Sequence, residues 1–291
     1  SYWADECHAQ GGTVVSAHFW GFSREVVVLV ATGRLDALEF KGHQREYTHQ
    51  EYYRLLNCGY QIPLVGGTDK MDNATPLGFY RTYVKMQEGE EFTFDNWCSN
   101  VRRGRTFMTA GPILHLSVNG QEIGDTVDID SPGTVEVDAW AESVVPIQRL
   151  DLIKNGEVVA SVKSADGTRR LEMKESIQVD AHSWLAIRAG SPTYFGDPDY
   201  DDLKRGIYSH SGPTYVACGG DWWMFDKDVA LHMLNIIEGD LAYIRETAGQ
   251  MPPDRVTHRH GDDNHIEYLS KPFIEAREAI HERMRKLGVS F

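Results

Sequence analysis

The sequence predicts a mixed fold: a parallel α/β layer, then an antiparallel β-sandwich, then a C-terminal helical segment. Three observations lead to this prediction. Short apolar strands alternate with capped helices over residues 1–112, which is typical of β-α-β units around a parallel sheet. From Ile113 to Gly219, apolar and polar residues alternate with a period of two, which is typical of antiparallel strands with one buried face. Beyond Gly220 the apolar residues return to helical spacing.

The first third of the chain is expected to hold three strands and two helices. The expected strands are residues 12–18, 35–40 and 62–69, and the helices between them are residues 23–32 and 48–57. Ser23 can cap the first helix and Gly33 can end it. Thr48 and Glu51 have the spacing of a capping box, in which a hydroxyl and a carboxylate satisfy each other's unpaired backbone N–H groups.

The next elements mark the change from the α/β layer to the sandwich. A strand is expected at residues 78–86, then a helix capped by Thr93, and then a strand at residues 104–109. Further along, Asn155 and Gly156 are expected to form the type I′ turn of a hairpin, because both tolerate positive φ.

Length and charge narrow the classes of function. The 29 Lys and Arg residues against 43 Asp and Glu residues give a formal net charge of −14. This argues against a nucleic-acid partner, because phosphate backbones bind clustered cations. The longest apolar run, residues 26–31, is far shorter than the ~20 residues that span a bilayer, so no membrane partner is expected. The 291 residues divide at the changes of pattern into domains of residues 1–112, 113–219 and 220–291.

The start of the chain and its cysteines leave the compartment open. The chain begins Ser-Tyr-Trp-Ala-Asp-Glu, without a Met or a signal-peptide pattern, which is typical of a processed chain with its first helix under way. The four cysteines lie far apart and include no Cys-x-x-Cys pair, so scattered thiols are the simplest interpretation.

The last domain is expected to hold helices at residues 226–247 and 272–287.

Each of the first three strands ends at or near a residue that can bind a metal or move a proton. These residues are His18, Glu39 and Asp69. The carboxyl ends of parallel strands lie at one edge of a sheet, where functional residues gather. One imidazole and two carboxylates suit a divalent cation that activates water. Alternatively, these residues are a buried histidine, a helix cap and the end of a turn.

The same segments resemble the polymerase-and-histidinol-phosphatase (PHP) superfamily, and in particular its CehA/McbA-like metallohydrolase branch. The motifs are Gly-Gly-Thr-Val-Val-Ser-Ala-His18-Phe, Leu-Asp-Ala-Leu-Glu39, Gly-Gly-Thr-Asp69-Lys, Gly78-Phe-Tyr-Arg-Thr-Tyr-Val and Gly104-Arg-Thr-Phe-Met-Thr-Ala-Gly-Pro. The resemblance covers residues 3–112 and continues more weakly to Ser209-His-Ser-Gly-Pro-Thr-Tyr-Val.

The resemblance implies a partial (β/α) PHP-type barrel and hydrolysis of esters or phosphoesters by a divalent metal such as Zn, Mn or Fe. His18 matches the histidine of an Ala-His-Pro-like segment and Asp69 matches the aspartate of an Asp-x-His motif, and both are metal ligands in the family. Glu39 matches by position on the strand that follows the histidine.

Two departures from the family pattern affect this metal site. Met71 stands where Asp-x-His has its histidine, and a thioether does not replace imidazole at such an ion. The family's opening His-x-His is missing from this chain, and 112 residues are too few for a barrel of roughly 250. The chain is therefore expected to carry half a metal site. A preceding barrel half or a second chain would supply the rest, unless the lineage has lost the metal.

Other polar residues are candidates for a role near this site or elsewhere. Lys70 and Arg81 are expected near the strand ends, where cations can stabilise negative charge during catalysis or form surface ion pairs. His43 and His49 can approach the site, although solvated positions are the simpler expectation. Residues 258–265 contain three histidines and two aspartates but lack the spacing of a structural zinc site, so a solvated loop is expected.

The sequence thus predicts a metal-dependent hydrolase with a small ester or phosphoester substrate and an incomplete metal site. The alternative is a non-catalytic protein whose sandwich binds carbohydrate or a protein partner, and Met71 favours this alternative. Trp222 and Trp223 are expected to be core or interface anchors rather than a sugar platform. A serine hydrolase is not predicted, because no Gly-x-Ser-x-Gly motif occurs.

Overall fold

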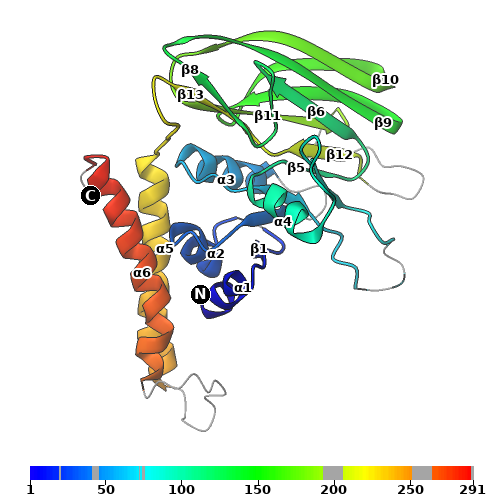
Figure 1. The fold of residues 1–291 in the computed structure, drawn as a ribbon. Coiled ribbons are helices and arrows are strands. Elements are labelled where there is room, and N and C mark those ends of the chain that lie inside the picture. Colours follow the sequence, from blue (N-terminus) through cyan, green and yellow to red (C-terminus); the bar gives the residue numbers. More distant parts are fainter. Residues whose placement is uncertain are drawn as a thin grey trace. The chain divides into compact units, whose positions relative to one another are not determined.

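The structure is a computed structural model that describes residues 1–19, 21–40, 46–71, 73, 76–192, 206–250 and 264–289. It confirms a mixed fold of helices and sheets, which includes a curled antiparallel sheet (Figure 1). The chain forms two compact units. The first consists of Ser1–Val14, Phe22–Leu35 and Asp226–Phe291, and the second consists of Val15–Gly21 and Asp36–Phe225.

The first unit is helical. Its elements are α1 (Tyr2–Ala9), α2 (Arg24–Ala31), α5 (Lys227–Thr247), the short 3-10 helix η1 (Ala248–Gln250) and α6 (His265–Lys286). Helices α5 and α6 lie side by side, and α2 packs against both (Figure 1). Asp226 caps α5 as the predicted start requires, whereas α6 begins seven residues before the predicted Pro272, since the Asn264 side chain caps it. Pro272 lies inside α6.

The second unit contains a small parallel sheet. Its strands are β1 (Val15–Ser16), β2 (Ala37–Phe40) and β3 (Leu64–Gly66), in the order β1-β2-β3, and both pairings are parallel as predicted. Helix α3 (Glu46–Asn57) precedes β3 in the chain. The predicted capping box is wrong, because Thr48 and Glu51 lie inside this helix on its buried face. Glu51 binds the Arg54 guanidinium instead, at 2.6 Å.

A second, ten-stranded sheet makes up the rest of this unit. Its main path runs β4-β5-β12-β11-β9-β6-β7. Its strands are β4 (Arg81–Val84), β5 (Thr106–Thr109), β6 (Ile113–Val118), β7 (Gln121–Glu122), β8 (Thr126–Ile129), β9 (Gly133–Lys154), β10 (Glu157–Val179), β11 (Ser183–Gly190), β12 (Tyr208–Ser211) and β13 (Thr214–Cys218). Helix α4 (Phe94–Arg102) connects β4 and β5 and is capped by Thr93 as predicted.

The long strands β9 and β10 form the largest hairpin of this sheet. The first half of β9 pairs with β6 and its last six residues pair with β11. One long strand thus joins β6 and β11 within the sheet. The alternating residues of these strands enclose one apolar core, which includes Leu116, Val137 and Ile187. Asn155 and Gly156 join β9 to β10 with φ values of 52° and 97°, which confirms the predicted hairpin turn.

The compact units cut across the predicted division at residues 112 and 219. Strands β4 and β5, which precede residue 112, belong to the same sheet as the strands that follow it. Residues 1–14 and 22–35 group with the C-terminal helices. No helix within the described ranges is long and apolar enough to cross a membrane.

Candidate functional site

The structure brings His18, Glu39 and Asp69 together at the carboxyl ends of β1, β2 and β3. The His18 Nε2 atom lies 3.4 Å from Asp69 Oδ1. The Glu39 Oε2 atom accepts a 2.8 Å hydrogen bond from the backbone N–H of His18. The His18 and Asp69 side chains are 30% and 22% exposed, so both can meet a small ligand. We call these three residues the strand-end cluster.

The backbone of the strand-end cluster adopts an uncommon conformation. His18 has a φ of 55° and Asp69 has a φ of 49°, so both lie in the left-handed region that residues other than glycine seldom occupy. Such conformations cost about 1–3 kcal/mol each and are concentrated at functional sites. The strand ends therefore turn sharply at the two residues whose side chains face each other.

Gly67 makes room for the Glu39 carboxylate. A Cβ atom at position 67 would lie 1.7 Å from Glu39 Oε1, which is impossible without moving the carboxylate. The lack of a side chain at Gly67 thus leaves room for Glu39 Oε1, while Glu39 Oε2 binds the His18 backbone on the other side of β2. Glu39 thus contacts the His18 backbone, and its predicted role as a metal ligand stays a prediction.

Threonine hydroxyls connect the end of β3 to β4. The Thr82 hydroxyl donates to Gly66 O at 2.8 Å and accepts from Gly66 N at 2.9 Å. The Thr68 hydroxyl does the same with the backbone of Tyr80, at 3.0 Å and 3.1 Å. These bonds place the start of β4, and with it Arg81, beside the strand end that leads to Asp69.

The two predicted catalytic cations differ in how they are held. Arg81 is partly buried, and its Nη1 donates to Gly78 O at 2.9 Å. Its Nε is buried and has no hydrogen-bond partner among the described residues. Lys70 follows Asp69 directly and is exposed.

The donors of the strand-end cluster fit part of a metal site. Two ligands that bind one zinc ion tetrahedrally at about 2.0–2.1 Å lie roughly 3.3 Å apart. The 3.4 Å between His18 Nε2 and Asp69 Oδ1 agrees with this separation. However, no group of three or more His, Cys, Asp or Glu side chains among the described residues could hold a metal by itself. The pair therefore fits two ligand positions of an incomplete site.

A buried cluster of histidines and tyrosines lies against Phe40, the last residue of β2. His49 bonds the Tyr208 hydroxyl, and His210 Nε2 lies 2.7 Å from the Tyr53 hydroxyl. The Phe40 ring contacts both imidazoles edge-on. The expectation of a solvated His49 is wrong, since its exposed fraction is 1%. His210 comes from β12, more than 150 residues away in the chain, and the sequence did not single it out.

The pKa of His210 is lowered to about 3. Burial is the largest cause because it penalises the charged imidazolium, and the Arg188 charge acts in the same direction. The hydrogen bond to the Ser211 carbonyl opposes both effects. His210 is therefore neutral in the folded protein at neutral pH, and its hydrogen bonds are those of a neutral ring.

This burial predicts a pH-dependent stability. Between about pH 6 and 4 the unfolded chain binds a proton at His210 that the folded chain does not, so the free energy of unfolding falls as the pH falls. The contribution of this residue to the slope is about 1.4 kcal/mol per pH unit. Urea denaturation of the wild type and of His210→Leu at a series of pH values measures this slope. An unchanged slope in the variant would contradict the prediction, whatever its absolute stability.

The structure describes some of the remaining predicted residues and not others. His43 and residues 258–263 lie outside the described residues, and His265 begins α6. Met71 is 82% exposed. The Trp222 indole donates to Ser183 O at 2.8 Å and packs edge-on against Tyr215, whereas Trp223 is 54% exposed. Trp222 is thus an anchor as predicted, and Trp223 lies at the surface.

Comparisons with known proteins leave the family of this chain open. No family model matches the chain, and no curated protein matches it. Among solved structures, the chain is similar to the fibronectin(III)-like modules of Clostridium thermocellum CbhA, with 20% identity and a TM-score of 0.19. The match covers 35% of this chain and 44% of that chain. A TM-score this low carries no argument about fold or function.

Proposed function

We propose that the strand-end cluster is part of the metal site of a hydrolase similar to the CehA/McbA-like branch of the PHP superfamily. In this proposal the parallel sheet β1-β2-β3 is a segment of a PHP-type barrel, and the curled antiparallel sheet is the sandwich-like domain that follows it. The observation that carries the proposal is the 3.4 Å approach of His18 Nε2 to Asp69 Oδ1, from the ends of two strands.

Each residue of the site has a separate role in this proposal. His18 and Asp69 supply two metal ligands, and Glu39 fixes His18 through its backbone N–H. Ligands beyond the described side chains complete the coordination, from further residues or from a second chain. A divalent ion bound there would supply a water of lowered pKa for attack on an ester or phosphoester. Arg81, which is partly buried, and Lys70, which is exposed, bind the anionic oxygen of the substrate.

Metal binding tests the proposal directly. Titration of the purified, metal-free protein with Zn²⁺ and Mn²⁺ is expected to give close to one bound equivalent. His18→Ala and Asp69→Ala are each expected to weaken binding by a factor of 100 or more, because each removes one ligand of a site that already lacks others. His115→Ala is the matched control, since His115 stacks on Trp140 in the antiparallel sheet. Binding below about 0.2 equivalents, or binding that both site variants retain, would refute the proposed metal site.

Hydrolysis is tested separately on metal-loaded protein. Nitrophenyl acetate and nitrophenyl phosphate report the two substrate classes. Arg81→Gln is expected to lower kcat/KM by roughly tenfold to a hundredfold while metal affinity stays unchanged, because Arg81 contacts substrate rather than metal. Metal binding without hydrolysis of either ester would support a metal site and refute the catalytic role of Arg81.

A non-catalytic binding protein is the second candidate. Met71 stands at the position where the resemblance expects a histidine ligand, and the described residues hold no complete metal site. In this case the His18–Asp69 contact is an ion pair that stabilises the sharp turns after β1 and β3. The metal titration separates the two candidates. The non-catalytic candidate requires that His18→Ala changes the stability of the protein by the same amount with and without metal.

A further inference from the structure

We propose that a second site, at the amino end of β3, binds a small organic phosphate. A cavity of about 290 Å³ lies there. Its lining includes three of the four residues of one turn, Arg102, Arg103 and Arg105, and one carboxylate, Asp125. The formal charge of these side chains is therefore +2, in a chain whose net charge is −14. A phosphate monoester carries a charge of about −1.5 to −2 at pH 7, which matches this lining.

Close backbone packing holds the turn of residues 102–105, which we call the arginine turn. Gly104 has a φ of 75°, and the loop between β7 and β8 packs directly on it through Gly124. A Cβ atom at Gly124 would lie 2.6–2.7 Å from the backbone of Arg103, Gly104 and Arg105. The turn is thus packed against the backbone of the β7–β8 loop before any ligand arrives. Such preorganisation lowers the entropic cost of binding.

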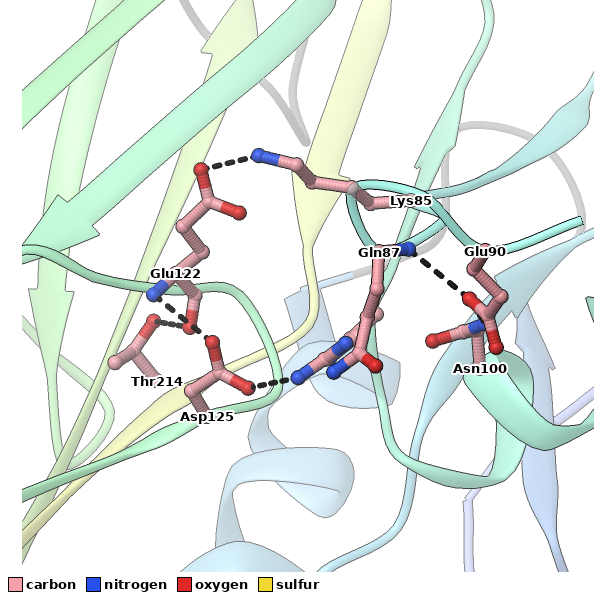
Figure 2. A network of polar contacts seen from close by, with 8 residues as sticks. Lys85, Gln87, Glu90, Asn100, Glu122, Asp125 and Thr214 are labelled. Carbon is pink, nitrogen blue, oxygen red and sulfur yellow. Dashed lines mark hydrogen bonds and ion pairs between the residues drawn. The ribbon is translucent and has the colours of Figure 1, made fainter.

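Side-chain contacts fix the Arg105 guanidinium at the edge of the cavity. Its Nη2 donates to Asp125 Oδ1 at 2.8 Å, and Asp125 also accepts from the backbone N–H of Glu122 (Figure 2). On the other side, the Gln87 carbonyl oxygen accepts from Arg105 in the amide orientation that satisfies Gln87. The backbone of Gln87 is held in turn by Glu90, which also binds Asn100 (Figure 2).

Arg103 is the guanidinium that is available for a ligand. It is exposed and lies at the carboxyl end of α4, and its charge acts on the Glu90 carboxylate without a hydrogen bond between these two described side chains. Basic residues are common at helix ends, where they interact with the helix dipole. The helix dipole does not account for Arg105, which follows the helix and precedes β5. It also does not account for the cavity that Arg103 and Arg105 line. A planar guanidinium binds two phosphate oxygens at once.

The rest of the cavity suits the organic part of the ligand. Tyr215 and Pro63 are buried and form part of the wall. The volume is near the lower limit of small-molecule pockets, which range from roughly 300 to 1,000 Å³. A phosphate group alone would leave most of this space empty, whereas a small phosphorylated metabolite would fill it.

This site is separate from the strand-end cluster. Gln61 and Pro63, which line the cavity, precede β3, whereas Asp69 follows β3. The two sites share no residue. The inference therefore does not depend on the proposed metal chemistry, and phosphate binding is expected to be the same in His18→Ala as in the wild type.

Calorimetric titration with glycerol 3-phosphate and with acetate at low ionic strength tests the proposal. Arg103→Gln is expected to weaken glycerol 3-phosphate binding by roughly tenfold, because a charge-assisted bidentate contact is lost. The matched control is Arg169→Gln, which removes an exposed arginine of β10 and changes the net charge equally. This control is expected to stay within twofold of the wild type.

Three outcomes would overturn the proposal. The first is that glycerol 3-phosphate does not bind at millimolar concentration. The second is that Arg103→Gln and Arg169→Gln weaken binding equally, which would indicate a diffuse charge effect. The third is that acetate binds as tightly as the phosphate, which would contradict the ligand class. Circular dichroism of Arg103→Gln checks that the exposed substitution leaves the fold unchanged.

Discussion

Asp151→Ala is expected to lower the free energy of unfolding by about 3–5 kcal/mol, which is typical for removing one partner of a buried ion pair. The Asp151 side chain is fully buried. One carboxylate oxygen binds Arg149 Nε at 2.7 Å and the Ser161 hydroxyl at 2.7 Å, and the other binds Arg188 Nε at 3.2 Å. Removal of the carboxylate would leave two guanidinium charges with low exposure and without this partner.

The location of Asp151 adds to the expected loss. Asp151 lies on β9, opposite Ser161 of β10 on one side and Arg188 of β11 on the other. Its contacts therefore connect three neighbouring strands. The loss therefore affects the part of the large sheet where the long hairpin meets β11.

Asp138→Ala is the matched control for this prediction. Asp138 also lies on β9 and pairs with Lys174 across the sheet at 3.0 Å, but both side chains are largely exposed. Solvent screens such a pair, so the expected cost is below about 1 kcal/mol. Urea denaturation at pH 7 measures both variants. Equal losses would show that burial of the Asp151 carboxylate does not determine its contribution.

Gly124→Ala is expected to cost about 2–4 kcal/mol, from two effects that add. Gly124 has a φ of 89°, which strains any other residue, and its Cβ would approach the Gly104 carbonyl carbon and Arg105 N within 2.7 Å. Neither contact can be relieved by moving a flexible side chain, because both involve backbone. The β7–β8 loop would have to separate from the arginine turn.

Comparison with Gly120→Ala isolates the steric part of this cost. Gly120 has a similar φ of 82°, but no atom lies within 4 Å of the added Cβ. The expected cost is the conformational strain alone, about 1 kcal/mol. Thermal denaturation of both variants gives the difference. If the two substitutions are equally destabilising, the backbone contact at Gly124 contributes nothing measurable.

Local pattern was sufficient to predict several elements correctly. The β-α-β spacing predicted the parallel pairing of β1, β2 and β3, and the Asn155-Gly156 pair predicted the hairpin turn. The same rule predicted that His18, Glu39 and Asp69 approach one another, because the carboxyl ends of adjacent parallel strands share one edge. The roles assigned to these residues in metal binding remain predictions.

The errors of prediction occurred where distant contacts outweigh local preference. The Thr48–Glu51 pattern has the form of a helix start, but Glu46 and Tyr47 already belong to α3, and Thr48 and Glu51 are buried within it. His49 has a local sequence typical of a solvated histidine, yet Tyr208, 159 residues away, provides its partner. Neither a helix boundary nor a hydrogen-bond partner at that distance can be read from short-range periodicity.

Local patterns were enough to predict the mixed fold, the parallel pairing of the first strands and the candidates His18, Glu39 and Asp69. These follow from periodicity and turn chemistry, which act over a few residues. The folded structure was needed to show that Glu39 binds the His18 backbone, that Arg103 and Arg105 line a cavity, and that Asp151 joins two arginines. Each of these features brings together residues from separate elements of the chain, and contacts of this kind leave no local pattern.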